Sequence, residues 1–136
     1  MQINPYLNFN GQCEAALKFY EKSLGGKIVF KITYGESPMA KETPAELHKQ
    51  ILHARFIVGT NVLMASDCPP GRYDEPKGIT ISISIEDPKE AESIFTALSE
   101  KGTICMPIQE TFWAHRFGML TDQFDIPWMI NCEKNG

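Results

Sequence analysis

Two histidines of this 136-residue chain stand beside arginines at similar places in its two halves. His53 lies two residues before Arg55, and His115 lies directly before Arg116. Histidine titrates near neutral pH and can transfer protons, whereas the planar guanidinium of arginine binds anions. On a strand, His53 and Arg55 would share one face, an arrangement that suits an anionic ligand.

Two carboxylates could join the histidines in a catalytic or relocated metal site. The candidate catalytic residues are therefore His53, Asp67, Glu110 and His115. Imidazole and carboxylate groups serve as general acids and bases and as ligands of divalent metals. The alternative, which we favour, is that these four are hydrogen-bonded residues of the sheet or of a dimer interface.

Aromatic residues concentrate in the last quarter of the chain. They are Phe112, Trp113, Phe117, Phe124 and Trp128. Such a cluster can line an apolar pocket that stacks planar ligands, and it can equally form part of the core. We expect at least one of the two tryptophans to contact a ligand.

The four cysteines show no CxxC spacing, so neither a zinc knuckle nor a thioredoxin-like motif is indicated. We interpret Cys13, Cys68, Cys105 and Cys132 as reduced, mostly buried thiols. A catalytic cysteine paired with His53 or His115 is the alternative.

The length is that of one ordinary domain, and 13 Lys and Arg against 17 Asp and Glu give a net charge of −4. This charge opposes nucleic-acid binding. Apolar runs are too short to span a bilayer, and a cationic segment followed by an apolar one does not open the sequence. We therefore expect a cytoplasmic protein.

Two segments have the apolar spacing of amphipathic helices. The first covers residues 11–24, and Gly25 and Gly26 supply a positive φ at its end. The second covers residues 88–101, with Asp87 as its N-cap and Gly102 at its end.

A shift of 90 − 14 = 76 residues superposes the two helices, since Glu14 then pairs with Glu90 and Gly26 with Gly102. The same shift brings the strand at 3–9 onto the strand at 79–85. A strand follows each helix, at 27–34 and 103–108, and a hairpin closes each half. The first hairpin pairs 51–58 with 62–67, and the second pairs 112–120 with 128–132. Each half is predicted to be a βαβββ module.

The predicted fold class is α+β, with two tandem modules that form a curved, incompletely closed mixed barrel around a cavity. The modules cover about 1–68 and 78–136 of a single domain, and about 69–77 form the linker. In the strand at 79–85 the isoleucines should meet the helix and the hydroxyl side chains the cavity. By the 76-residue shift, Ile3, Leu7 and Phe9 should pack on the first helix, while Tyr6 and Asn8 face the cavity. Residues 36–47 are predicted to be a loop, either a lid or a variable surface segment, followed by an exposed His48.

Several motifs resemble PhnB-like proteins of the vicinal oxygen chelate superfamily. They are Pro5-Tyr6-Leu7-Asn8-Phe9, Leu63-Met64-Ala65-Ser66-Asp67, the segment 109–118 and Pro127-Trp128-Met129-Ile130-Asn131. The superfamily includes glyoxalase I, extradiol dioxygenases and fosfomycin and bleomycin resistance proteins, and some PhnB-like members carry a 3-demethylubiquinone-9 3-methyltransferase label. The resemblance implies paired βαβββ modules and a homodimer.

Enzymes of that superfamily hold a divalent metal with four side chains, typically His and Glu. The resemblance carries these positions to Pro5, Leu63, Ile81 and Met129, within one residue. Because neither these residues nor their strand neighbours are imidazoles or carboxylates, we expect no metal at the inherited site and no cofactor.

The favoured function is therefore the binding of a small aromatic or anionic compound. The predicted ligand-binding residues are Tyr6, Asn8, Arg55, Ser82, Trp113 and Trp128. The alternative is a metal-dependent lyase, isomerase or dioxygenase that uses the relocated site. Methyl transfer is disfavoured because the sequence lacks a Gly-rich turn between a strand and a helix.

Overall fold

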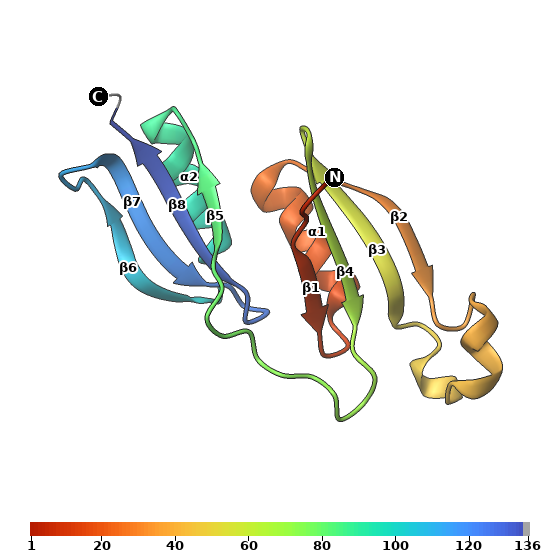
Figure 1. Ribbon diagram of the computed structural model, residues 1–136. Coiled ribbons are helices and arrows are strands. Elements are labelled where there is room, and N and C mark those ends of the chain that lie inside the picture. The colour runs from red at the N-terminus through yellow and green to blue at the C-terminus, as the bar shows by residue number, and fades with distance from the viewer. Residues whose placement is uncertain (135–136) are drawn as a thin grey trace. The chain divides into compact units, whose positions relative to one another are not determined.

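The computed structural model describes residues 1–134, and the chain divides into two compact units, Met1–Asp74 and a second that starts at Glu75. Each unit has the order βαβββ, so the α+β class and the two modules are confirmed (Figure 1). The described strands form two separate four-stranded sheets and do not close into a barrel.

The first unit contains β1 (Tyr6–Phe9), α1 (Cys13–Leu24), β2 (Lys27–Thr33), β3 (Ile51–Val58) and β4 (Asn61–Asp67). The sheet order is β1-β4-β3-β2, with β1 parallel to β4 and the other neighbours antiparallel. Alternate side chains of β1 and β4 are buried against α1, among them Leu7, Phe9 and Ala65. We call the opposite side of this sheet the open face of the first unit.

The second unit repeats this arrangement with β5 (Ile81–Ser84), α2 (Pro88–Leu98), β6 (Thr103–Gln109), β7 (Ala114–Thr121) and β8 (Pro127–Glu133). The sheet order is β5-β8-β7-β6. Ile81 and Ile83 pair with the buried Trp128 and Ile130 on the helix side, so Ser82 and Ser84 point the other way, as predicted. That other side is the open face of the second unit.

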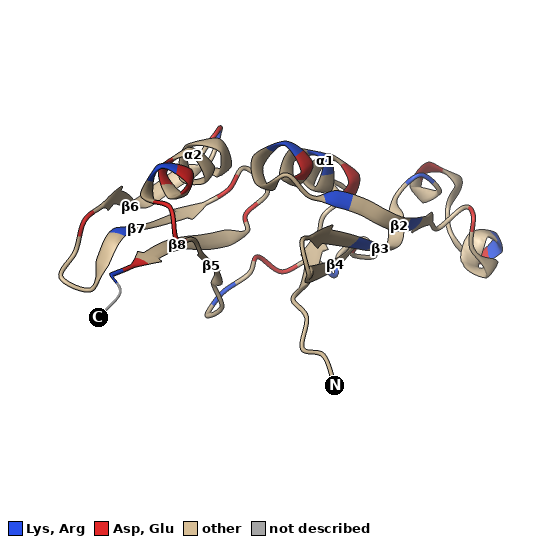
Figure 2. Cartoon of the chain, turned by 90° about the horizontal axis from the view of Figure 1, so that it is seen from above, with Lys and Arg blue, Asp and Glu red and all other residues tan. Residues whose placement is uncertain are grey.

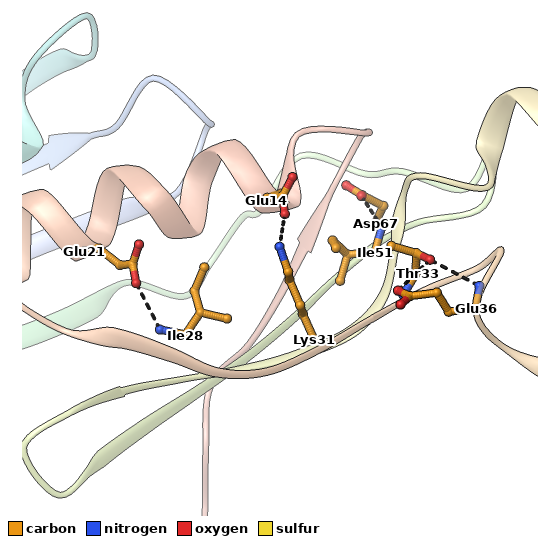
Figure 3. Close-up of polar contacts among 8 residues, drawn as sticks. All are labelled: Glu14, Glu21, Ile28, Lys31, Thr33, Glu36, Ile51 and Asp67. Atoms are coloured by element: carbon orange, nitrogen blue, oxygen red, sulfur yellow. Dashed lines mark hydrogen bonds and ion pairs between the residues drawn. The ribbon is translucent and has the colours of Figure 1, made fainter.

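Charged residues lie on the surfaces of both helices (Figure 2). In the first unit, a charged residue of the helix forms an ion pair with the edge strand of the sheet. Lys31 of β2 forms an ion pair with Glu14 of α1, as Figure 3 shows. The Lys31 ammonium lowers the pKa of Glu14. Both side chains are more than two-fifths exposed, so the pair contributes little to stability.

The glycines after the helices do not all have the expected role. Gly25 ends α1 in the left-handed conformation, with φ 78°. In contrast, α2 ends at Leu98, before the end predicted beside Gly102, and Lys101 takes a positive φ of 57°. Gly102 lies so close to the Thr121 carbonyl that a β-carbon would clash, and Gly26 has the same relation to the carbonyl of Ile57. The matched glycines therefore let the chain pass close to the neighbouring strand.

Two expectations about the strand ends and the loop were wrong. Ile3 and Ile79 lie outside the strands and are 91% and 76% exposed, so neither packs on a helix. The segment at 36–47 contains two short 3₁₀ helices, η1 (Pro38–Glu42) and η2 (Ala45–Leu47). His48, expected to be exposed, is partly buried and hydrogen-bonded to the Ala40 and Thr43 carbonyls. Within residues 1–134, none of the helices is long and apolar enough to cross a bilayer.

Candidate ligand-binding site

The open face of the first unit gathers a group of aromatic and basic side chains, which we call the Tyr6 cluster: Tyr6, Phe30, His53 and Arg55. The Tyr6 hydroxyl and His53 Nδ1 are hydrogen-bonded at 3.1 Å, and the two rings stack with centroids 5.8 Å apart. Phe30 also contacts the His53 ring, with a centroid distance of 6.1 Å and the rings tilted by 49°. Two chemically different surfaces, an imidazole and exposed aromatic rings, therefore meet at one place.

Strand register explains why these residues come together. Tyr6 is the partner of Met64, Met64 of Arg55, and Arg55 of Phe30, so one row crosses all four strands. Partners on adjacent strands share a sheet face, which brings their β-carbons to about 4.5–5.5 Å. Tyr6 is 43% and Phe30 is 47% exposed, so both rings are accessible. Arg55 is also exposed and supplies a positive charge beside them.

The equivalent row in the second unit has different chemistry. Ser82 is the partner of Met129, Met129 of Met119, and Met119 of Met106. This Met row offers polarisable thioethers where the first unit has Tyr, Arg and Phe. Phe30, Met64 and the Met row were not predicted as site residues, because their grouping depends on the register between strands.

Trp113 lies at the edge of this second open face and contacts Phe117. The two rings are edge-on at 5.3 Å, and Phe112 packs edge-on to Trp113 at 4.8 Å. Phe117 is the strand partner of Asn131, which lies on the open face with Ser84. Trp113 is 41% exposed and its ring is available for contact.

Trp128 occupies a different place from the one expected. It is 1% exposed, and its indole Nε1 donates to Oδ2 of the buried Asp122 at 2.8 Å. Asp122 also accepts from the amides of Phe124 and Ile126 through Oδ1. The indole belongs to the core on the helix side of the sheet, so we remove Trp128 from the proposed ligand-binding residues.

The four candidate catalytic residues are dispersed, and Asp67 is the clearest case. Its side chain points to the helix side of the first sheet, opposite His53, and it is 2% exposed. Its Oδ1 accepts from the Cys13 amide at 2.9 Å. Its Oδ2 accepts from the Ile51 amide at 2.8 Å, the contact drawn in Figure 3. Asp67 therefore caps α1 and fixes the start of β3, which is a structural role.

In the second unit, Glu110 pairs with Lys134 at 2.8 Å, and this ammonium lowers the pKa of Glu110. Arg116 pairs with Glu92 of α2 at 2.5 Å, on the helix side of the sheet. His115 is exposed at the start of β7. Among residues 1–134, no group of three or more His, Cys, Asp or Glu side chains is arranged to hold a metal.

The inherited metal positions can now be read from the strand register. Leu63 and Ile81 face the helices, so the open-face neighbours are Met64 and Ser82. The open faces present Tyr6, Asn8, Met64, Ser66, Ser82 and Ser84 on β1, β4 and β5, and Met129, Asn131 and Glu133 on β8. Glu133 is a single carboxylate at the end of β8 that accepts from the Asn131 amide at 2.8 Å. Without an imidazole or a second carboxylate, these side chains do not fit a hard divalent cation.

Comparison with known proteins agrees with this architecture. The glyoxalase/bleomycin resistance protein/dioxygenase superfamily profile matches residues 2–130. The chain is 36% identical to protein YjdN of Escherichia coli over 98% of this chain and 97% of that protein.

Solved structures give the same result. Protein PA1353 of Pseudomonas aeruginosa is 45% identical, with a TM-score of 0.90 and coverage of 99% of both chains. A PhnB protein from Bacillus cereus shares the fold at 23% identity, with a TM-score of 0.81 and coverage of 96% of this chain and 98% of that one. The chain therefore belongs to the glyoxalase/bleomycin resistance protein/dioxygenase superfamily.

Proposed function

We propose that this protein binds a small aromatic anion on the open face of its first unit and does so without the divalent metal of its enzymatic relatives. The observation that carries the proposal is the Tyr6 cluster. Aromatic rings at Tyr6 and Phe30 offer stacking surfaces, and Arg55 lies beside them in the same row. A carboxylate or phosphonate attached to a planar ring satisfies both features.

His53 supplies a directional contact in this proposal. Its Nδ1 is engaged with the Tyr6 hydroxyl, which fixes the ring and leaves Nε2 for the ligand. A ring nitrogen that donates to an anionic oxygen would orient the ligand relative to Arg55.

We propose no metal-dependent reaction at the positions that hold the metal in enzymes of the superfamily, because the side chains there are poor ligands for a divalent cation. Serine, methionine, asparagine and tyrosine side chains stand where imidazole and carboxylate would be needed. Asn8 lies on the same open face as the Tyr6 cluster and is a further proposed contact of this ligand. Ser82 and Trp113 lie in the second unit and remain proposed ligand-binding residues of that unit's own open face. We also propose a cytoplasmic homodimer, an assembly that would cover the exposed Val29 on edge strand β2.

The test is an isothermal titration with benzoate and phenylphosphonate, with toluene sulfonamide as a neutral comparison. Arg55→Gln should weaken anion binding about tenfold or more, because a hydrogen bond to a charged group contributes about 1.5–3 kcal/mol. Arg72→Gln removes an exposed arginine outside the cluster and is the matched control. Equal weakening by both variants would attribute the binding to net charge and contradict the proposal.

Loss of Phe30 separates stacking from charge. Phe30→Leu keeps an apolar side chain on β2 but removes the ring face, so aromatic anions should bind more weakly while inorganic phosphate is unaffected. Tight binding of Mn²⁺, Ni²⁺ or Zn²⁺ by the anaerobically purified protein, abolished by substitution of Ser82 or Met129, would overturn the metal-free part of the proposal.

A further inference from the structure

A separate pocket lies in the first unit, beyond the ends of its central strands. Its volume is about 250 Å³. Apolar lining comes from Tyr34 after β2, from Met39 and Leu47 of the two 3₁₀ helices, and from Pro69 and Pro70 after β4. The Tyr6 cluster does not contribute to this lining.

The wall of this pocket is held by hydrogen bonds. The Thr43 hydroxyl donates to the Met39 carbonyl at 2.8 Å, and His48 Nε2 lies 3.0 and 2.9 Å from the carbonyls of Ala40 and Thr43. On the opposite side, the Tyr34 hydroxyl donates to the Asp67 carbonyl at 2.9 Å. A pocket with restrained walls loses less conformational entropy when a ligand enters than one that must first be formed.

The charge of the lining residues indicates the charge of the ligand. Glu42 contributes a carboxylate, whereas lysine and arginine are absent from the lining residues. The Tyr34 hydroxyl is already engaged by the Asp67 carbonyl, and an aromatic ring in the lining can attract a cation through its π-system. Burial raises the pKa of Tyr34 further above physiological pH, so this phenol carries no charge of its own in the pocket.

We propose that this pocket binds a small organic amine, with an aromatic or aliphatic body on Tyr34, Leu47 and the prolines and an ammonium group at Glu42. Ligand pockets are usually about 300–1,000 Å³, so a volume near the lower limit restricts the ligand to a compact molecule. The site is distinct from the anion site of the proposed function, and it requires the opposite ligand charge.

Phenethylamine is a suitable probe because it combines a ring with a primary ammonium group. In a two-dimensional NMR titration up to about 10 mM, the amides of Tyr34 and Leu47 should shift in a saturable manner. Phenylacetate, which has a carboxylate in place of the amine, should bind more weakly. Failure of phenethylamine to shift these amides would overturn the proposal.

Two substitutions localise the effect. Glu42→Gln should weaken phenethylamine binding about two- to fivefold, the range expected for an exposed ion pair, whereas Glu46→Gln should leave it unchanged. Glu46 is a matched control because it is exposed in η2 and does not line the pocket. Equal effects of the two variants would show that the preference for a cation comes from the overall negative charge, and would refute the assignment of the ammonium site to Glu42.

Filling the pocket gives the second arm of the test. Leu47→Trp should reduce phenethylamine affinity at least about tenfold through steric exclusion. Met39→Trp serves the same purpose if Leu47→Trp does not fold, since Met39 is 44% exposed and tolerates enlargement. His53→Ala should leave phenethylamine binding intact. If phenethylamine still binds to the variant with the filled pocket but not to His53→Ala, its site is the open face and the proposal is refuted. That outcome would leave the proposed anion binding on the open face untouched.

Discussion

Replacement of Asp67 by alanine tests whether this carboxylate is structural, as its contacts indicate, or catalytic, as its residue type suggested. Asp67 accepts two backbone hydrogen bonds from segments distant in sequence, the first residue of α1 and the first residue of β3. Gln12, at the N-cap position of α1, makes no capping side-chain hydrogen bond. The helix start therefore depends on a residue 54 positions away.

The magnitude follows from these two contacts. A hydrogen bond to a charged acceptor contributes about 1.5–3 kcal/mol, so the two together would contribute about 3–6 kcal/mol. Removal of the buried carboxylate also relieves its desolvation cost, which offsets part of the loss. We expect Asp67→Ala to lower the free energy of unfolding by about 3 kcal/mol. Asp67→Asn should cost less, because one acceptor oxygen remains.

Urea titration followed by far-UV circular dichroism measures this change, and amide exchange at Cys13 and Ile51 localises it. Ser66→Ala, a change at the adjacent open-face position, should alter stability by no more than about 0.5 kcal/mol. A loss below about 1 kcal/mol for Asp67→Ala, with unchanged exchange at the two amides, would refute the structural role.

Four further outcomes follow from the structure. Burial raises the pKa of the Cys13 thiol above its ordinary 9.0, so iodoacetamide should modify exposed Cys105 first, as mass spectrometry can show. Because only the unfolded state then ionises this thiol, its contribution to stability should fall as the pH rises above about 9, which urea titrations at two pH values can measure. Gly26→Ala should cost about 2–3 kcal/mol, since the new β-carbon would meet a backbone carbonyl at 2.5 Å, whereas Gly25→Ala should cost about 1 kcal/mol for its positive φ alone; equal costs in thermal unfolding would contradict this explanation. Lys31→Ala should cost under about 1 kcal/mol in the same assay, and a larger loss would show that its half-exposed ion pair is stronger than expected.

Local patterns in the sequence were sufficient to predict most of the fold. The apolar spacing of α1, the Asp87 cap of α2 and the alternation around Ser82 all depend on residues a few positions apart. Asp87 indeed accepts from the Lys89 amide at 3.0 Å. For the same reason β3 begins and ends at the residues predicted for it.

The site was less predictable because its geometry depends on distant partners. The face on which Asp67 lies, and the amides that it meets, follow from pairing between β1, β3 and β4. The prediction that Trp128 contacts a ligand was wrong because its indole donates to Asp122 on the helix side, a partner that the local sequence does not indicate. By contrast, Tyr6, Asn8 and Ser82 lie on the open faces as predicted, because strand alternation alone determines their side. Arg55 shares the face of His53 for the same reason.

The matched rows on the two open faces also bear on how such a protein can change during evolution. Substitution on the helix side disturbs a packed core, as at Phe56 or Ile130, which are fully buried. The open-face positions are mostly half-buried or exposed, so substitutions there reduce the stability of the fold less. They form two rows across the strands, Tyr6-Met64-Arg55-Phe30 and Ser82-Met129-Met119-Met106. A duplicated module can thus keep its backbone while each copy acquires its own surface chemistry, and the arginine-containing row and the methionine row are two outcomes of that freedom.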